Sequence, residues 1–291
     1  MPALLVLVAV TAVWGVTFVQ VKDAVAIYPL FAFLALRFGI ASCTLAVPTG
    51  GRLRALGREG ARGAALAGTL LAAGYALQTA GLERTSVSST GFITGMYVVL
   101  TPLLALALFR VRIGVAAWTG VGLATIGLAL LSGLHGGSVV GDLLVLASAA
   151  VYALQIVMME RYAPRFDAFA FTLVEMITAF AGLVVVAAAA GQLSVPHGWT
   201  VWSALLVTGV FASALAFLAQ TWAQRKASAT QTALAFSLEP VWAAFFGFTL
   251  AGDRLGATAW LGCAVIMAGI VLAEPTAGEI LARLVRRERP A

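Results

Sequence analysis

The stretch "SLEPVWAAFFGFTLAGDRLGATAWLGCAVIMAGIVL" (Ser237–Leu272) contains two apolar runs separated by the short polar turn Gly252–Leu255. A helix that crosses a bilayer needs roughly 17–25 mostly apolar residues. The first run, extended back to residue 228, and the second run both have that length. The first run also holds a carboxylate beside a proline, Glu239 and Pro240, where hydrocarbon is expected. The stretch therefore predicts two membrane-spanning helices, one of them with an unusual polar position.

The composition of the whole chain agrees with this prediction. Its 291 residues are 62% hydrophobic and 10% charged, with a mean hydropathy of +1.00, whereas soluble domains carry about 25% charged residues. The basic residues are scattered between apolar runs instead of forming one patch, which excludes a nucleic-acid partner. Cys43 and Cys263 both lie in predicted spans, so no disulfide is expected. The lipid bilayer is the expected partner of this integral membrane protein.

Ten apolar runs are predicted to span the membrane, and we expect an all-α fold. They cover residues 3–22, 29–48, 63–82, 87–109, 113–131, 142–160, 168–190, 200–222, 228–250 and 256–274. The positive-inside rule then predicts the orientation. With a cytoplasmic N-terminus, the outside segments hold three basic residues, Lys22, Arg84 and Arg254. The inside segments hold fourteen: Arg52, Arg54, Arg58, Arg62, Arg110, Arg112, Arg161, Arg165, Arg225, Lys226, Arg283, Arg286, Arg287 and Arg289. Both termini are therefore predicted to be cytoplasmic.

The chain is predicted to be a duplicated unit, because five matches recur in order along it. They pair Leu5–Trp14 with Leu143–Tyr152, Phe31–Phe38 with Phe169–Met176 and Pro102 with Pro240 at a shift of 138, and Gln78–Thr79 with Gln220–Thr221 and Ala117–Gly127 with Ala259–Gly269 at a shift of 142. Each half holds five spans, an odd number, so the halves are predicted to cross the membrane in opposite directions. Such inverted repeats are typical of alternating-access transporters. We predict a first repeat at 1–138, a second at 139–275 and a basic cytoplasmic tail at 276–291.

The five-plus-five layout, the closing stretch Ser237–Leu272 and "TGFITGMYVVLTPLLALAL" (Thr90–Leu108) resemble the EamA-type transporters of the drug/metabolite superfamily. The resemblance covers essentially the whole chain. Its strongest motif is the Leu-Glu-Pro turn followed by Gly-Asp-Arg-Leu and the Trp-x-Gly helix. It implies export of small metabolites from a bacterial cytoplasm through the inner membrane, with amino acids a recurrent substrate class. It does not identify the substrate.

Glu239 admits two interpretations. A carboxylate in a span is a candidate for proton or substrate coupling, but it can also hold a kinked helix to neighbouring donors. The family resemblance favours the second role, because the Glu-Pro pair recurs across members with different cargo. Pro240 and Pro102 each lack a backbone N–H and free a carbonyl four residues earlier, so we predict a pair of gating kinks.

Arg37 and Glu175 fall at matching positions of the two repeats. They pair directly only if both approach the pseudo-twofold axis, and otherwise each has its own partner. Removing one partner of a buried ion pair costs about 3–5 kcal/mol, so a structural role is favoured over coupling for both.

Neutral polar and aromatic residues are predicted to line a central substrate cavity, because polar side chains in spans usually face the bundle interior. Hydrogen bonding between helices is the alternative for any one of them, at about 0.6 kcal/mol each. The candidates are Trp14, Thr17, Gln20, Tyr75, Gln78, Thr79, Thr94, Tyr97, Thr101, Tyr152, Gln155, Met159, Phe217, Gln220, Thr221, Gln231 and Ser237.

No catalytic or metal constellation is found, since His135 and His197 lie in different external loops and no paired-aspartate motif is near a span. An enzyme is thus disfavoured, and no cofactor or metal is expected. A first span without a carboxylate argues against a cation-drug exporter, and a single basic residue deep in a span argues against a sugar-phosphate carrier. The sequence favours a secondary exporter of neutral or zwitterionic metabolites, most of all amino acids, acting as a monomer or homodimer. Multidrug, nucleobase or sugar transport on the same fold is the alternative.

Overall fold

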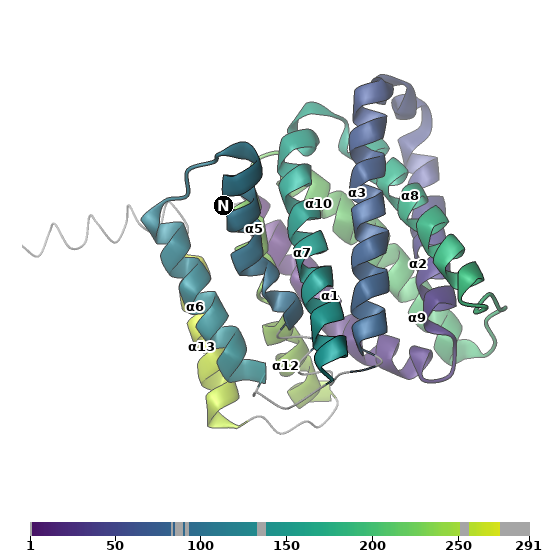
Figure 1. Cartoon of the computed structure of the whole chain (residues 1–291). Coiled ribbons are helices and arrows are strands. Elements are labelled where there is room, and N and C mark those ends of the chain that lie inside the picture. The colour runs from purple at the N-terminus through teal and green to yellow at the C-terminus, as the bar shows by residue number, and fades with distance from the viewer. Residues whose placement is uncertain are drawn as a thin grey trace, which may run out of the picture.

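The computed structural model describes residues 2–82, 84, 90, 93–132, 138–250 and 256–273. These residues form helices and connecting turns, without a strand (Figure 1), which confirms the all-α prediction for them. The predicted tail at 276–291 and the turn Gly252–Leu255 lie outside these described residues, as do parts of other loops. The elements are α1 (Pro2–Val25), α2 (Leu30–Thr49), η1 (Gly50–Arg52), α3 (Leu53–Leu82), α5 (Tyr97–Phe109), α6 (Val115–Ser132), α7 (Val139–Tyr162), η2 (Ala163–Arg165), α8 (Ala168–Ala189), α9 (Trp199–Gly209), η3 (Val210–Leu215), α10 (Ala216–Ala223), α11 (Ala229–Phe236), α12 (Glu239–Leu250) and α13 (Ala257–Ala273).

Several of these helices are long and apolar enough to cross a membrane. In the described part of the chain, four segments meet that criterion: 30–82, which joins α2 and α3, then 139–165, 168–189 and 199–223. Shorter apolar helices cover 2–17, 93–109, 115–130 and 257–272. Apolar helices of this length bury their backbone hydrogen bonds within themselves, which is what hydrocarbon requires. The protein is a multi-pass membrane protein.

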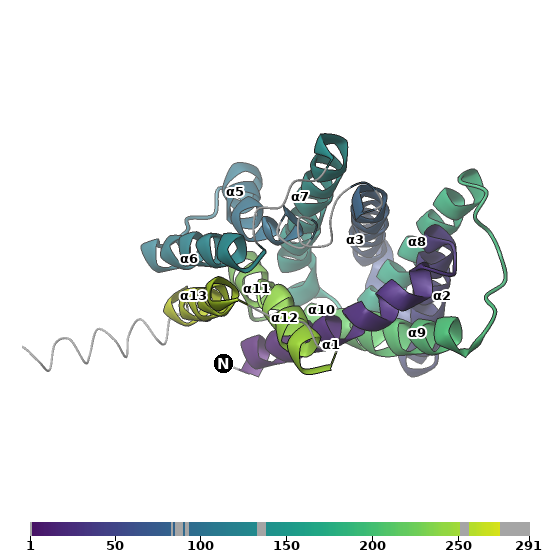
Figure 2. The same ribbon diagram turned by 90° about the horizontal axis from the view of Figure 1, so that it is seen from below.

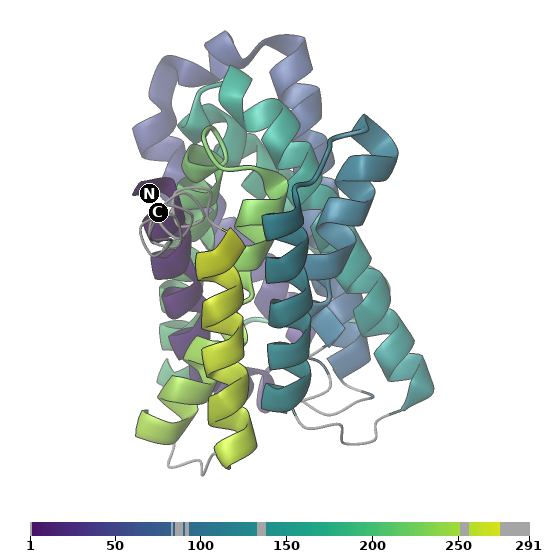
Figure 3. The same ribbon diagram turned by 90° about the vertical axis from the view of Figure 1, so that its left-hand side faces the viewer.

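Helices α6 and α13 form a pair at one edge of the bundle. Figure 3 shows them running side by side, and Figure 2 shows them on the opposite side of the molecule from α2, α8 and α9. Glycines permit the close approach: a Cβ added to Gly127 would lie 2.7 Å from the carbonyl oxygen of Gly262, and one added to Gly269 would lie 2.8 Å from that of Gly120. The glycine faces of these two helices thus meet each other within one chain.

The opposite side of the bundle is built from α2, α3, α8 and α9. Helix α8 packs against α2 and α3, while α9 packs against α2. A Cβ at Gly68 of α3 would lie 2.3 Å from the carbonyl oxygen of Glu175, and a Cβ at Gly209 of α9 would lie 3.1 Å from that of Arg37. Each glycine therefore lets its helix lie directly on the backbone of a helix that carries a buried charged residue.

Two helices depart from regular α geometry near the middle of the bundle. Residues Val210–Leu215 form a π-helical segment between α9 and α10, and such segments are frequent at functional sites. The helix preceding Glu239 ends at Phe236, and α12 starts at Glu239. Pro240 is therefore the second residue of a new helix, where a missing N–H costs little. Pro102 lies inside the continuous helix α5.

Candidate functional site

Aromatic and polar side chains from both halves of the sequence meet between α1, α2, α3, α7 and α10. We call this group the central cluster; it consists of Trp14, Arg37, Phe38, Tyr75, Gln78, Thr94, Tyr152, Ser213, Phe217 and Phe236. Trp14, Tyr75, Gln78, Thr94 and Tyr152 are partly exposed, while the other members are buried. The cluster thus combines a packed apolar base with polar groups that keep some accessible surface.

Arg37 is anchored to the π-helical segment. Its Nε donates a hydrogen bond to Ser213 Oγ at 2.7 Å, and its Nη2 donates to the carbonyl oxygen of Ala212 at 3.2 Å. The indole N–H of Trp14 donates to the same carbonyl at 2.8 Å. The carbonyl oxygen of Ala212 thus accepts hydrogen bonds from two side chains of different helices. The π-helical segment therefore fixes both a buried cation and the largest aromatic side chain of the cluster.

A chain of contacts extends from Arg37 across the cluster. Its Nη2 lies 3.4 Å from the Tyr75 hydroxyl, and its guanidinium carbon lies 5.3 Å from the centroid of that ring. The ring of Tyr75 packs edge-on against the ring of Tyr152, with their centroids 5.6 Å apart. The Tyr152 hydroxyl donates to Gln78 Oε1 at 3.4 Å, and Gln78 Nε2 donates to Thr94 Oγ1 at 3.0 Å. These contacts join four separate helical segments into one polar surface.

Glu239 lies at the same centre, at the start of α12. Its carboxylate is close enough to Arg37, Tyr75 and Tyr152 to interact with them electrostatically. It forms no ion pair within 4.0 Å of Arg37 in the described chain, and it is partly exposed. The cluster therefore carries a guanidinium cation and a carboxyl group that interact electrostatically without forming an ion pair in the described chain.

A second polar group, which we call the glutamine network, lies between α7, α8 and α10. Gln155 Nε2 donates to Glu175 Oε1 at 2.8 Å, and Gln220 Nε2 donates to Gln155 Oε1 at 3.2 Å and to Gln224 Oε1 at 2.9 Å. Gln224 Nε2 donates to the carbonyl oxygen of Ile156 at 2.9 Å. All four side chains are buried, with 2% exposure or less. Arg37 and Glu175 thus have separate partners, and no ion pair joins them.

The structure brings together only part of the predicted site. The hydroxyl groups of Thr221 and Thr172 share a hydrogen bond beside the glutamine network, and the Thr17 hydroxyl donates one to the backbone carbonyl of Trp14. The Ser237 hydroxyl donates a hydrogen bond to the backbone carbonyl of Leu234, and Gln231 forms a capping box with Ser228 at the start of α11. The other candidates divide by exposure: Gln20 is exposed, whereas Thr79, Tyr97, Thr101 and Met159 are buried. Met159 packs in an apolar group with Leu56 and Phe171.

Four members of the two groups were missed by the sequence reasoning. Gln224 follows Gln220 by one helical turn, a spacing that places both on one face and that carried a usable signal. Phe38 and Phe236 resemble ordinary core residues of an apolar span. Ser213 lies in the run "FASALAF" (Phe211–Phe217), and nothing in that run signals a π-helical segment.

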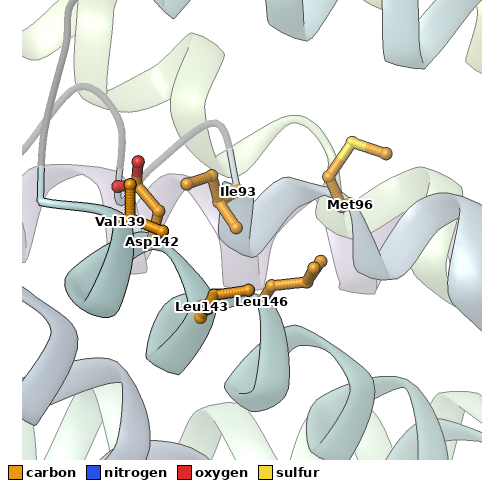
Figure 4. Close-up of a pocket in the computed structure, with 6 residues that line it drawn as sticks. All are labelled: Ile93, Met96, Val139, Asp142, Leu143 and Leu146. Carbon is orange, nitrogen blue, oxygen red and sulfur yellow. The ribbon is translucent and has the colours of Figure 1, made fainter.

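Two surface pockets lie away from the central cluster. One of about 320 Å³ lies beside Pro164, Trp222, Arg225 and Lys226. The other, also about 320 Å³, lies between the segment with Ile93 and Met96 and the start of α7, and its walls are apolar except for Asp142 (Figure 4). Neither contains a residue from the predicted site.

Comparisons with known proteins agree with the helical architecture. One solved protein crystal structure superposes with a TM-score of 0.80 at 18% sequence identity, covering 96% of this chain and 98% of the other; this likeness shows the fold alone. An uncharacterized transporter from Archaeoglobus fulgidus is 30% identical over 268 residues, which are 91% of this chain and 83% of the relative. The model of the EamA-like transporter family matches residues 1–133 and again residues 139–273. The chain therefore belongs to the EamA-like transporter family.

Proposed function

We propose that this protein is a secondary transporter that exports small amphipathic metabolites, above all amino acids, across a bacterial inner membrane. The observation that carries the proposal is the central cluster, where Arg37 and Glu239 lie near the same tyrosines without pairing with each other. A zwitterion offers one carboxylate and one ammonium, and two separated opposite charges match that pattern. Membrane pockets for small molecules are mostly apolar with a few placed polar groups, as in this cluster.

The chemistry of each group suggests its part in binding. The Arg37 Nη1 atom has no hydrogen-bond partner in the described chain, whereas Nε and Nη2 are used. A guanidinium binds carboxylates by parallel hydrogen bonds. Glu239 is placed to attract an ammonium, and the rings of Tyr75 and Trp14 add a favourable surface for that cation or for an apolar side chain. An amino acid would thus span the distance between the two charges.

The proposed architecture is ten spans in two inverted repeats. Two reciprocal sets of contacts support it. Gly127 lies on Gly262 as Gly269 lies on Gly120, at a sequence shift of 142 in both cases. Helix α3 packs on α7 as α9 and α10 pack on α1, and the family match itself occurs twice. A site between inverted halves near the middle of the membrane is the usual arrangement in such transporters.

The proposed orientation has both termini in the cytoplasm. Predicted inside segments contact one another: Arg165 donates to both carboxylate oxygens of Glu59 at 2.6 and 2.9 Å, and Arg161 lies 5.2 Å from the Phe109 ring centroid. Predicted outside loops also meet, because the Tyr28 hydroxyl donates a hydrogen bond to the carbonyl oxygen of Ser194. Gln192 in the same loop accepts one from the backbone N–H of Phe31, at the outer end of the second predicted span, at 2.9 Å. Basic residues therefore gather at one end, which the positive-inside rule assigns to the cytoplasm.

Alternating access requires helices that bend near the site. The π-helical segment Val210–Leu215 and the break between α11 and α12 both lie beside the central cluster. Because interrupted helices have fewer internal hydrogen bonds to lose, they are the places where one half can rock against the other. We propose these two interruptions as the bending points, with Pro240 marking the second and Pro102 its counterpart in the first half.

The test is flux of labelled amino acids in proteoliposomes with and without a pH gradient. Saturable flux that competes with unlabelled amino acids is expected. Trp14→Ala and Tyr75→Ala are expected to change the order of preference among amino acids, whereas Trp118→Ala, an exposed tryptophan on α6, serves as the matched control. No flux of any amino acid from folded protein would reject this substrate class and direct the search to nucleobases, sugars or drugs.

A further inference from the structure

The glutamine network contains a carboxyl group that is sealed inside the protein. Glu175 is 0% exposed, and its Oε1 accepts one hydrogen bond, from Gln155. Its Oε2 has no hydrogen-bond partner among the residues that the structure describes. An ionised carboxylate buried with a single neutral donor is strongly unfavourable, because the lost hydration is not replaced. The geometry is therefore that of a neutral carboxylic acid.

The hydrogen-bond inventory of the network points to the same conclusion. The Gln220 amide donates to Gln155 and Gln224, yet its own Oε1 is buried without a hydrogen-bond donor in the described part of the chain. Two buried acceptors, Glu175 Oε2 and Gln220 Oε1, are thus left over, and the network is short of one donor. A proton on Glu175 Oε2 turns that atom into a donor and supplies the missing hydrogen.

Other charged and titratable groups do not supply a counter-charge to Glu175. Helices α2, α3 and α10 pack on α8, and α7 reaches it through Gln155. Their titratable and charged groups include Arg37 and Cys43 on α2, Tyr75 at the inner end of α3, and Tyr152 and Glu160 on α7. Near the start of α3 lie Arg54, Arg58, Glu59 and Arg62. Asp142 is in the first turn of α7, and Arg161 and Tyr162 are in its last turn. None of these groups forms a hydrogen bond or an ion pair with Glu175 in the described chain.

Packing closes this carboxyl off from water in the present conformation. Gly68 of α3 lies on the Glu175 backbone so tightly that an added Cβ would be 2.3 Å from its carbonyl oxygen. Gln155 and Gln220 cover the side chain from α7 and α10. Exchange of the proton with water therefore requires a covering helix to move relative to α8. Movement of α3, which belongs to the first predicted repeat, is the motion expected of alternating halves.

We propose that Glu175 and its surrounding glutamines form the proton-binding site that couples transport to a pH gradient; the coupling rests on the transport function proposed above. The carboxyl carries a proton while the site is sealed. When the site opens to one face of the membrane, the O–H bond breaks and the proton passes to water, leaving the hydrated carboxylate. A ligand that binds one conformation more tightly than another shifts the equilibrium between them, and the proton acts as that ligand here.

Infrared spectroscopy tests the proton itself, without reference to any substrate. The wild-type minus Glu175→Gln difference spectrum at neutral pH is expected to contain the carbonyl stretch of a protonated, buried carboxylic acid. The matched control is Glu160→Gln on the neighbouring helix α7, whose carboxylate accepts a hydrogen bond from the backbone N–H of Ala229 at 3.0 Å. Its difference spectrum is expected to lack that band. Absence of the band from the Glu175 difference would overturn the proposal.

Thermal unfolding gives a second readout. Since the folded protein binds one more proton than the unfolded chain, raising the pH should destabilise the wild type, by about tenfold in the unfolding equilibrium per pH unit where only the folded state is protonated. Glu175→Gln should remove this slope. An unchanged slope in the variant, or stabilisation of the wild type by sodium ions with no effect of pH, would contradict a proton site.

The coupling is tested in proteoliposomes by comparing two fluxes. Glu175→Gln is expected to abolish accumulation driven by a pH gradient while retaining exchange of labelled for unlabelled amino acid. Accumulation that still follows the gradient in the variant would overturn the coupling role. If the wild type moves no amino acid, the proposed function fails, and the infrared band still decides whether the proton site exists.

Discussion

Arg37 on α2 and Glu175 on α8 occupy matching positions at a sequence shift of 138, yet the structure gives them opposite surroundings. Arg37 is tied to a serine hydroxyl, a backbone carbonyl and a tyrosine beside partly exposed aromatic rings. Glu175 accepts one hydrogen bond inside a sealed network and keeps an oxygen without a partner. Both lie under a glycine of a neighbouring helix, Gly209 and Gly68 respectively.

The difference indicates how two matching positions of the sequence can serve two tasks. The backbone contacts of the two positions are similar, because close helix packing depends on small residues at particular places. The side-chain contacts differ, because the π-helical segment faces Arg37 while glutamines face Glu175. We infer that the first position keeps a charge ready for a substrate and the second keeps a charge neutralised.

The largest loss of stability is expected when Arg37 is replaced by the neutral amide glutamine. Arg37→Gln removes charge-assisted hydrogen bonds to Ser213 and Ala212 and leaves a buried hydroxyl without its donor. Hydrogen bonds to charged groups contribute about 1.5–3 kcal/mol each, so we expect a loss of about 3 kcal/mol in the free energy of unfolding. Denaturation of the purified protein in detergent measures it.

Glu175→Gln is the matched partner of that experiment. An amide has nearly the shape of a protonated carboxyl and also offers a donor toward Gln220, so the loss at neutral pH should stay under about 1 kcal/mol. A cost as large as that of Arg37→Gln would show that Glu175 is ionised and paired, and the contrast between the two positions would disappear.

An intermediate loss of stability is expected when a methyl group is added at Gly68 or Gly209, where two helices approach each other closely. Gly68→Ala places a methyl group against the carbonyl oxygen of Glu175, and this backbone atom cannot move away by a change of rotamer. Overpacking of this kind costs about 1–3 kcal/mol. Gly209→Ala should cost less, because the atoms nearest to its Cβ belong to the Ile40 side chain. Thermal unfolding of both variants ranks them.

Gly122→Ala is the control for these glycine variants, since no atom lies within 4 Å of its added Cβ. It should be neutral or stabilise α6 by up to about 1 kcal/mol through helix propensity. If all three variants lose the same stability, the close approaches on α8 and α2 do not matter for folding.

The spans were predictable from the sequence because lipid imposes one simple requirement, a long apolar run with all backbone groups paired. The runs at 168–190 and 200–222, for example, coincide with α8 and with α9 to α10 within a few residues. The proline kinks were harder to foresee. Pro240 was expected to bend one helix, whereas a turn at Ser237 and Leu238 separates two helices before it.

The candidate site was less predictable because composition shows which residues are polar and not which way they face. Trp14, Tyr75, Gln78, Thr94 and Tyr152 do lie together, while Gln231 caps a helix and Met159 packs in an apolar group. A capping box and a core methionine have no signature that distinguishes them from cavity residues inside an apolar span. The π-helical segment that organises the cluster depends on tertiary donors far away in sequence, so local sequence does not reveal it.

The smallest effect is expected at the edge of the glutamine network, where Thr172 and Thr221 share a hydrogen bond of 2.8 Å between α8 and α10. Hydrogen bonds between membrane helices contribute about 0.6 kcal/mol on average, and Thr221 also bonds back to the Phe217 carbonyl of its own helix. A double-mutant cycle with Thr172→Val and Thr221→Val should therefore give a coupling energy near 0.6 kcal/mol. A coupling above about 2 kcal/mol would mean that this pair, and not Glu175 with its glutamines, holds α8 to α10, and the proton would then have little leverage on the motion of those helices.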